Sequence, residues 1–122
     1  MLIKNFYKIV NIKHSNNSII GKIILNEKHN VYKGHFPAQP VVPGVIQIQI
    51  VKEILSETIN KNLLLKNAGN IKYLALLTPS ENRELNVIIE YKQEDNNDYN
   101  VKASINSSNT TFMKLKGVYS LA

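Results

Sequence analysis

The chain has 122 residues, the size of one domain, and its shares of hydrophobic residues (43%) and charged residues (20%) are typical of a globular protein. It contains no cysteine, which excludes a disulfide scaffold, a cysteine-ligated metal and thiol catalysis. The net charge is +6, but every basic residue except Arg83 is a lysine, and the lysines are scattered along the chain. This composition favours an acidic partner over a nucleic acid.

The first half of the chain predicts two strands and a helix. Isoleucine-rich segments at Phe6–Ile12 and Ser18–Leu25 are typical of strands, and a polar turn separates them. The segment Lys33–Gly44 is rich in proline and glycine and cannot be regular throughout. Behind it, Val45–Asn60 predicts a helix whose apolar residues cover most of the helical wheel, as in a central, buried helix.

The second half of the chain changes to a period of two, which is typical of strands. We expect strands at residues 70–77, 85–91, 99–105 and 112–121. Strands around one long helix form an α+β arrangement, and no linker or repeat divides it, so we expect a single domain over residues 1–122. No segment is typical of a signal peptide or a membrane span, so we expect a cytoplasmic protein without membrane insertion.

The proline-rich segment is the most informative part of the chain for chemistry. It fixes His35 on a rigid loop in front of the predicted helix, which begins near Gly44. The first N–H groups of a helix have no intrahelical partner and lie at its positive end, where they can polarise a carbonyl. A histidine can move protons near neutral pH. Together these groups are the minimum equipment for removing a proton α to a thioester.

This segment also resembles the signature of a known family, the (3R)-hydroxyacyl-acyl-carrier-protein dehydratases of the Z and A type. The resemblance rests on the run Gly34-His35-Phe36-Pro37-x-x-Pro40-Val41-x-Pro43-Gly44-Val45. It implies a hotdog fold, in which a five- to six-stranded antiparallel sheet wraps one long central helix. It also implies removal of water from 3-hydroxyacyl thioesters of acyl carrier protein, giving trans-2-enoyl thioesters in fatty acid or polyene biosynthesis.

The resemblance assigns roles to individual residues. His35 matches the histidine that takes the α-proton, and Gly44 matches the glycine whose N–H binds the thioester carbonyl. Val45 adds a second N–H at the same place, and Phe36 and Pro43 are expected to contact the substrate. The resemblance implies no metal and no cofactor.

One position departs from the family pattern. The family places an acidic side chain on the central helix fourteen positions after the histidine, and this chain has Gln49 there. A carboxamide can hydrogen-bond a hydroxyl but cannot exchange a proton with it. Glu53 lies one helical turn further on and could replace the acid only if the substrate bound in a shifted pose; we expect it to be an ordinary solvated helix residue.

The family builds its sites at a dimer interface, so we expect a homodimer, a heterodimer with a hotdog paralogue, or a larger oligomer. The expected substrate carrier is acyl carrier protein, whose acidity suits the net charge of +6. The alternative is a non-catalytic acyl-thioester-binding subunit that pairs with an active hotdog paralogue. A hotdog thioesterase is less favoured, because the His-Phe-Pro run is typical of the dehydratases. A nucleic-acid binder is the least favoured interpretation.

Overall fold

The computed structural model of this chain describes residues 5–29, 32 and 40–122. The described residues form one helix and six strands, and the helix and the strand number confirm the predicted α+β class. The elements are β1 (Tyr7–Ser15), β2 (Ser18–Leu25), α1 (Gly44–Ile59), β3 (Leu63–Tyr73), β4 (Glu84–Gln93), β5 (Tyr99–Asn106) and β6 (Thr111–Leu121).

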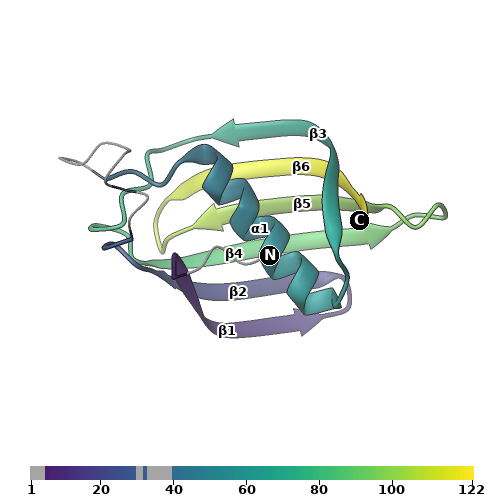
Figure 1. The fold of residues 1–122 in the computed structure, drawn as a ribbon, viewed down its shortest axis with the longest axis horizontal. Helices are drawn as coiled ribbons and strands as arrows, with labels where there is room; N and C mark the ends of the chain where they lie inside the picture. The colour runs from purple at the N-terminus through teal and green to yellow at the C-terminus, as the bar shows by residue number, and fades with distance from the viewer. Residues whose placement is uncertain (1–4, 30–31, 33–39) are drawn as a thin grey trace.

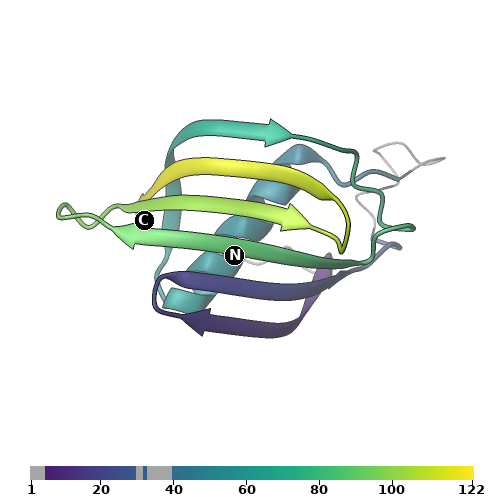
Figure 2. The ribbon, with the colours of Figure 1, turned by 180° about the vertical axis from the view of Figure 1, so that it is seen from behind.

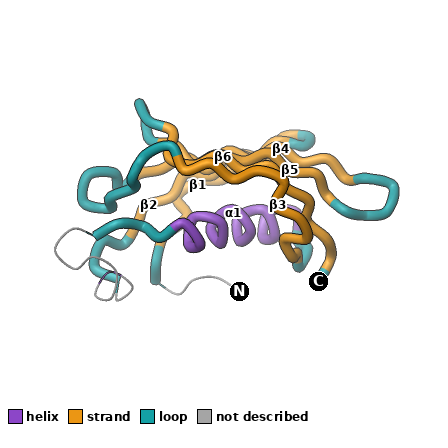
Figure 3. The backbone as a smooth tube through the Cα atoms, turned by 90° about the horizontal axis from the view of Figure 1, so that it is seen from above, coloured by secondary structure: helices purple, strands orange, loops and turns teal. Residues whose placement is uncertain are grey.

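The strands form one antiparallel sheet in the order β1-β2-β4-β5-β6-β3, so β1 and β3 are its edges. The helix α1 crosses one face of this sheet (Figure 1). In the opposite view the strands lie in front of the helix (Figure 2). Seen edge-on, the helix and sheet form two layers, and no described element covers the sheet face opposite α1 (Figure 3).

Packing, rather than its own ends, stabilises α1. The N-cap residue Pro43 provides no side-chain hydrogen bond, and the first turn has no acidic residue. Instead Ile50, Val51 and Ile54 are completely buried. A Cβ at Gly21 on β2 would lie 3.1 Å from Cδ1 of Ile12 on β1, so glycine at this position leaves room for that side chain beneath the helix. The β-branched residues of the helix are therefore suited to this core although their helix propensity is modest.

The third strand differs from the prediction. The sequence predicts a strand at residues 70–77, but β3 starts at Leu63 and ends at Tyr73. Its first half does not alternate, because the register with β6 is shifted around Asn67, and an edge strand needs only one partner. Residues 74–77 form a loop that is held by two backbone hydrogen bonds, from Leu74 N–H to the Phe112 carbonyl (2.8 Å) and from Val42 N–H to the Leu77 carbonyl (2.8 Å).

Candidate active site

The backbone in front of α1 is held from two sides. The N–H of Val42 donates to the Leu77 carbonyl (2.8 Å), and the carbonyl of Val42 accepts from Nε2 of Gln47 (3.2 Å). Gln47 is only 3% exposed. Sequence reasoning missed this residue, which interrupts an apolar run and gives no signal of its partner. Because both backbone groups of Val42 are bonded, the start of the helix is fixed in place.

Two N–H groups at this helix start are available to a ligand. The N–H groups of Ile46 and Gln47 donate to the Pro43 carbonyl (3.1 and 3.2 Å). The N–H groups of Gly44 and Val45 have no partner among the described residues. They lie at the positive end of a sixteen-residue helix, where a carbonyl oxygen or an enolate is stabilised. Pro43, Gly44 and Val45 form the start of α1, and their expected contact with a substrate stays a prediction.

Tyr73, at the end of β3, lies directly over Gly44. A Cβ built on Gly44 would come within 2.6 Å of the Tyr73 hydroxyl oxygen and 2.7 Å of Cζ, so only glycine fits beneath this ring in its present place. Partial burial raises the pKa of Tyr73 above its ordinary value, which keeps the phenol protonated and able to donate. The sequence indicates only a strand aromatic here, since twenty-nine positions separate Tyr73 from Gly44.

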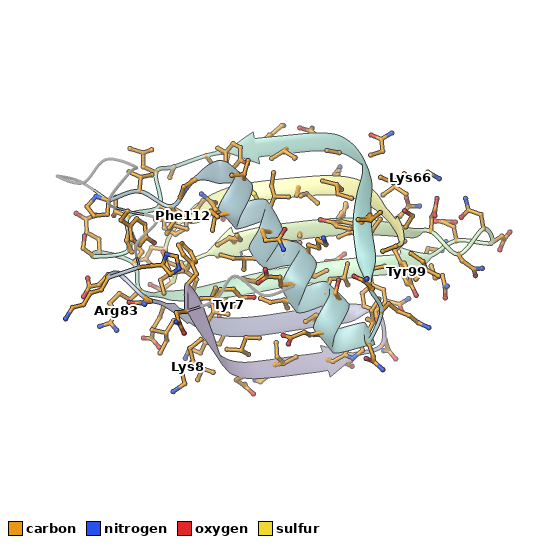
Figure 4. The ribbon with its side chains drawn as sticks, viewed as in Figure 1. Tyr7, Lys8, Lys66, Arg83, Tyr99 and Phe112 are labelled. Carbon is orange, nitrogen blue, oxygen red and sulfur yellow. The ribbon has the colours of Figure 1, made fainter. Side chains whose placement is uncertain are left out.

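Gln49 belongs to a partly buried polar network. Its Nε2 donates to Oε2 of Glu53 (2.9 Å), and the hydroxyl of Tyr7 donates to Oε1 of the same carboxylate (2.8 Å). Tyr7 comes from β1 and lies beside the helix (Figure 4). Burial, with the Glu53 carboxylate as a second cause, raises the pKa of Tyr7, so its hydroxyl remains a donor.

The expectation that Glu53 is solvated is wrong. Its exposed fraction is 3%, and Tyr7, from β1, lies against it and donates a hydrogen bond to it. Position on the helical wheel gives no sign of this, since Lys52, Ser56 and Glu57 on the same side are half-buried or exposed. Glu53 is a buried carboxylate with two side-chain donors, adjacent to the position where the family has its acid.

The predicted residues do not all come together in one protomer. Gln49 lies five residues after Gly44, which is about 140° around the helix axis and about 7.5 Å along it. The two residues therefore lie on different sides of the helix. His35 and Phe36 lie outside the described residues.

Exposed apolar side chains surround the helix start. Val45 is 73% exposed and Leu76 is 70% exposed, and Tyr73 and Leu74 are about half exposed. We call these four residues the apolar rim. It adjoins β3, one of the two edge strands of the sheet, whose outer backbone edge has no strand partner among the described residues. Exposed apolar groups of this size, gathered beside an open edge, are typical of an interface.

The described part of the chain contains no group of three or more acidic or histidine side chains that could hold a metal ion. Among the same residues, no helix has the length and hydropathy that crossing a membrane requires.

A helix packed across a six-stranded antiparallel sheet of this order is a hotdog fold, so the class that the resemblance implies is confirmed. A solved hotdog structure, the dehydratase heterocomplex ApeI:P from Xenorhabdus doucetiae, matches with a TM-score of 0.68. The match covers 93% of this chain and 96% of that one at 16% sequence identity, and it shows the fold alone.

The family follows from the sequence. The model of the ApeI dehydratase family (ApeI-like) matches residues 11–114, and the chain belongs to this family. Two similar curated relatives are the 3-hydroxyacyl-acyl-carrier-protein dehydratases FabZ of Rickettsia canadensis (30% identical over 88 residues) and Rickettsia massiliae (31% over 88 residues). Each alignment covers 64% of this chain, and the chain spans 60% and 59% of the length of these relatives.

Proposed function

We propose that this protein removes water from 3-hydroxyacyl thioesters of acyl carrier protein to give trans-2-enoyl thioesters. The observation that carries the proposal is the helix start, where the Gly44 and Val45 N–H groups are unpaired among the described residues and held in place. Membership of a dehydratase family supports this reaction over other uses of a carbonyl-binding helix end. The proposal includes a single domain over residues 1–122, acting in the cytoplasm without a cofactor.

The proposed chemistry uses both ends of the proline-rich segment. The two N–H groups donate hydrogen bonds to the thioester carbonyl oxygen, which makes the α-carbon more acidic and stabilises the enolate. His35 takes the α-proton, and the electron pair of that C–H bond forms the new double bond as the bond from C3 to the hydroxyl breaks. The imidazolium that results can return its proton to the departing hydroxyl, which leaves as water. Phe36 and Pro43 contact the substrate beside these groups.

Gln49 has a limited part in this scheme. Its carboxamide can hold the substrate hydroxyl by a hydrogen bond but cannot supply a proton. Glu53 accepts from Nε2 of Gln49 at 2.9 Å and so restricts the orientation of the carboxamide. We therefore assign Gln49 to substrate binding and Glu53 to positioning Gln49.

The site needs two protomers in this proposal. Gln49 and Gly44 lie on different sides of one helix, whereas a second protomer can bring its own helix residue to the first protomer's carbonyl site. The apolar rim and the open edge of β3 support such a contact next to that site. The partner is a second copy of this chain or a hotdog paralogue. The structural neighbour from Xenorhabdus is a dehydratase heterocomplex, which supports the second arrangement.

A second candidate function is a non-catalytic acyl-thioester-binding subunit that pairs with an active paralogue. The observation that favours it is Gln49 itself, because a carboxamide stands at the position where the family has its acid and cannot supply a proton. In that case the paralogue supplies the acid.

The test is a hydration and dehydration assay with 3-hydroxyacyl and enoyl carrier-protein thioesters. We expect turnover by the wild-type protein and its loss in His35→Ala. A swapped variant, Gln49→Glu with Glu53→Gln, keeps one carboxylate and one carboxamide in contact but moves the acid to position 49. A wild-type protein that is inert alone, together with an active swapped variant, would contradict the enzyme proposal and support the binding subunit.

A further inference from the structure

The sheet face opposite α1, which we call the outer face, carries an unusual set of charges. Residues that pair across neighbouring strands share a face, so the register of the sheet identifies its members. All of its charged side chains are exposed. They are Lys8, Lys13, Lys22, Lys72, Lys92, Lys102, Lys114 and Lys116, together with Glu84 and Glu90.

The outer face accounts for the whole net charge of the protein. Eight lysines and two glutamates give it a charge of +6, which equals the charge of the full chain. The remaining charged residues consist of seven basic and seven acidic side chains and cancel. Lysines that are scattered in the sequence thus gather on one face, because alternate residues of a strand point the same way.

Some of these lysines face one another at a cost. Lys102 lies directly opposite Lys116, and Lys72 lies directly opposite Lys114. Like charges in directly opposite positions destabilise a sheet. Lys102 has Glu90 opposite it on its other side, and Lys22 lies 3.8 Å from Glu84, but neither Lys72 nor Lys114 has an acidic residue directly opposite it. The lysine excess of this face therefore suits an external anionic surface.

We propose that the outer face docks on an anionic lipid bilayer. The lysines occupy all six strands, a width of about 24 Å, and a broad, extended surface can meet all of them at once. Ile20, which is 43% exposed, pairs with Ile88 between β2 and β4 on the outer face. An apolar pair within a lysine-rich surface suits the boundary between headgroups and acyl chains.

A hollow on the same face gives room for headgroups. It has a volume of about 1000 Å³, and its lining includes Lys92, Lys102 and Lys116. Asn16, from the β1–β2 turn, and other amide side chains also line it and can hydrogen-bond phosphate oxygens. Glu90 also lines the hollow, so a lipid phosphate that enters it meets three cationic groups and one carboxylate, which leaves an excess of positive charge.

Two features favour a bilayer as the anionic partner of the outer face. The outer face has no arginine, and arginine is the side chain that binds nucleic-acid phosphates and bases in a bidentate manner. The candidate active site lies beside α1, on the other side of the sheet (Figure 3). Docking through the outer face leaves the site and the apolar rim accessible to a carrier and to a second protomer.

Vesicle co-sedimentation with the full chain tests this proposal without any acyl substrate, so its result is separate from that of the dehydratase assay. We expect binding to vesicles of phosphatidylcholine mixed with phosphatidylglycerol, and none to phosphatidylcholine alone. Binding should weaken steeply as the ionic strength rises from about 0.1 M towards 1 M. The triple variant Lys102→Gln, Lys114→Gln and Lys116→Gln should bind about a hundredfold more weakly.

A matched control removes the same charge elsewhere, with Lys28→Gln, Lys61→Gln and Arg83→Gln at exposed positions off the outer face. The control should bind within a fewfold of the wild type. The outer-face variant should unfold at the same or a higher temperature, because it removes like-charged pairs. Equal weakening of both variants, or no preference for phosphatidylglycerol, would overturn the proposal. Binding of DNA or polyglutamate in the absence of vesicle binding would also overturn it.

Discussion

At the scale of single residues, the contact with Glu53 helps to explain why position 49 has a glutamine in place of the family's acid. A carboxamide at position 49 can donate to the buried Glu53 carboxylate, which a second carboxylate could not do. The two residues therefore form a compatible pair, with Tyr7 as the other donor to Glu53. A buried carboxylate with two donors is stable, whereas one that loses a donor is costly. The glutamine thus completes a local hydrogen-bond network, and it also removes the proton-exchanging group that the family has at this position.

This network predicts the effect of restoring the acid alone. Gln49→Glu puts two carboxylates in contact, which raises the pKa of the pair in the folded state above the ordinary value near 4.3. The variant should therefore keep its stability below about pH 4 and lose about 1–2 kcal/mol as the pH rises to 7. Urea unfolding of wild type and variant at both pH values measures this. The swapped variant has one carboxylate and should show no such loss, and an equal loss in it would contradict the explanation.

At the scale of elements, the contact between β3 and α1 shapes the candidate site. Tyr73 at the end of β3 covers Gly44 at the start of α1, and the Val42–Leu77 hydrogen bond ties the neighbouring loops together. Strand, loop and helix therefore support one another at the point where the carbonyl would bind. The start of α1 has no side-chain cap, so the contacts with Tyr73 and Leu77 hold it in place instead.

A double-mutant cycle tests the contact between β3 and α1. Gly44→Ala should destabilise the wild type by about 1 kcal/mol, because the new methyl group must displace the Tyr73 ring. In a Tyr73→Ala background the same change should be neutral or stabilising by up to about 1 kcal/mol, since alanine favours a helix more than glycine does. Chemical denaturation at one protein concentration measures both values. Identical effects in the two backgrounds would show that the ring does not constrain Gly44.

At the scale of the whole molecule, the apolar rim and the outer face lie on different parts of the surface and suit different partners. The apolar rim adjoins the helix start and the free edge of β3. The outer face carries the net charge on the opposite side of the sheet. A dimer that uses the rim would therefore leave the basic face of each protomer exposed.

The proposed dimer gives a direct prediction. Leu76→Asp places a charge in the apolar rim at a side chain that is 70% exposed in the protomer. We expect a folded monomer with lost dehydratase turnover, because an exposed substitution changes protomer stability by about 0.5 kcal/mol or less. Light scattering after size exclusion measures the mass. Val10→Asp, at a half-exposed apolar residue on β1, is the control and should remain a dimer; a Leu76→Asp dimer with full activity would contradict this interface.

Much of the fold could be predicted from the sequence, because periodicity reports which face of an element is buried. The period-two strands β4, β5 and β6 and the wide apolar stripe of α1 lie where the pattern predicts them. The strand β3 does not, because an edge strand with register shifts has no regular alternation. The helix start at Gly44 was predictable from Pro43-Gly44, but the position of Tyr73 over it was not, since nothing local links them.

The sequence by itself determined the class, the family resemblance and the residues at the start of the helix, because these depend on local pattern and on a contiguous run of residues. Only the tertiary structure decided that Glu53 is buried, that Tyr73 covers Gly44 and that the lysines share one face. Each of these depends on which distant segments become neighbours. The charge of +6 is a property of the sequence, but its concentration on one side of a sheet follows from strand order and register.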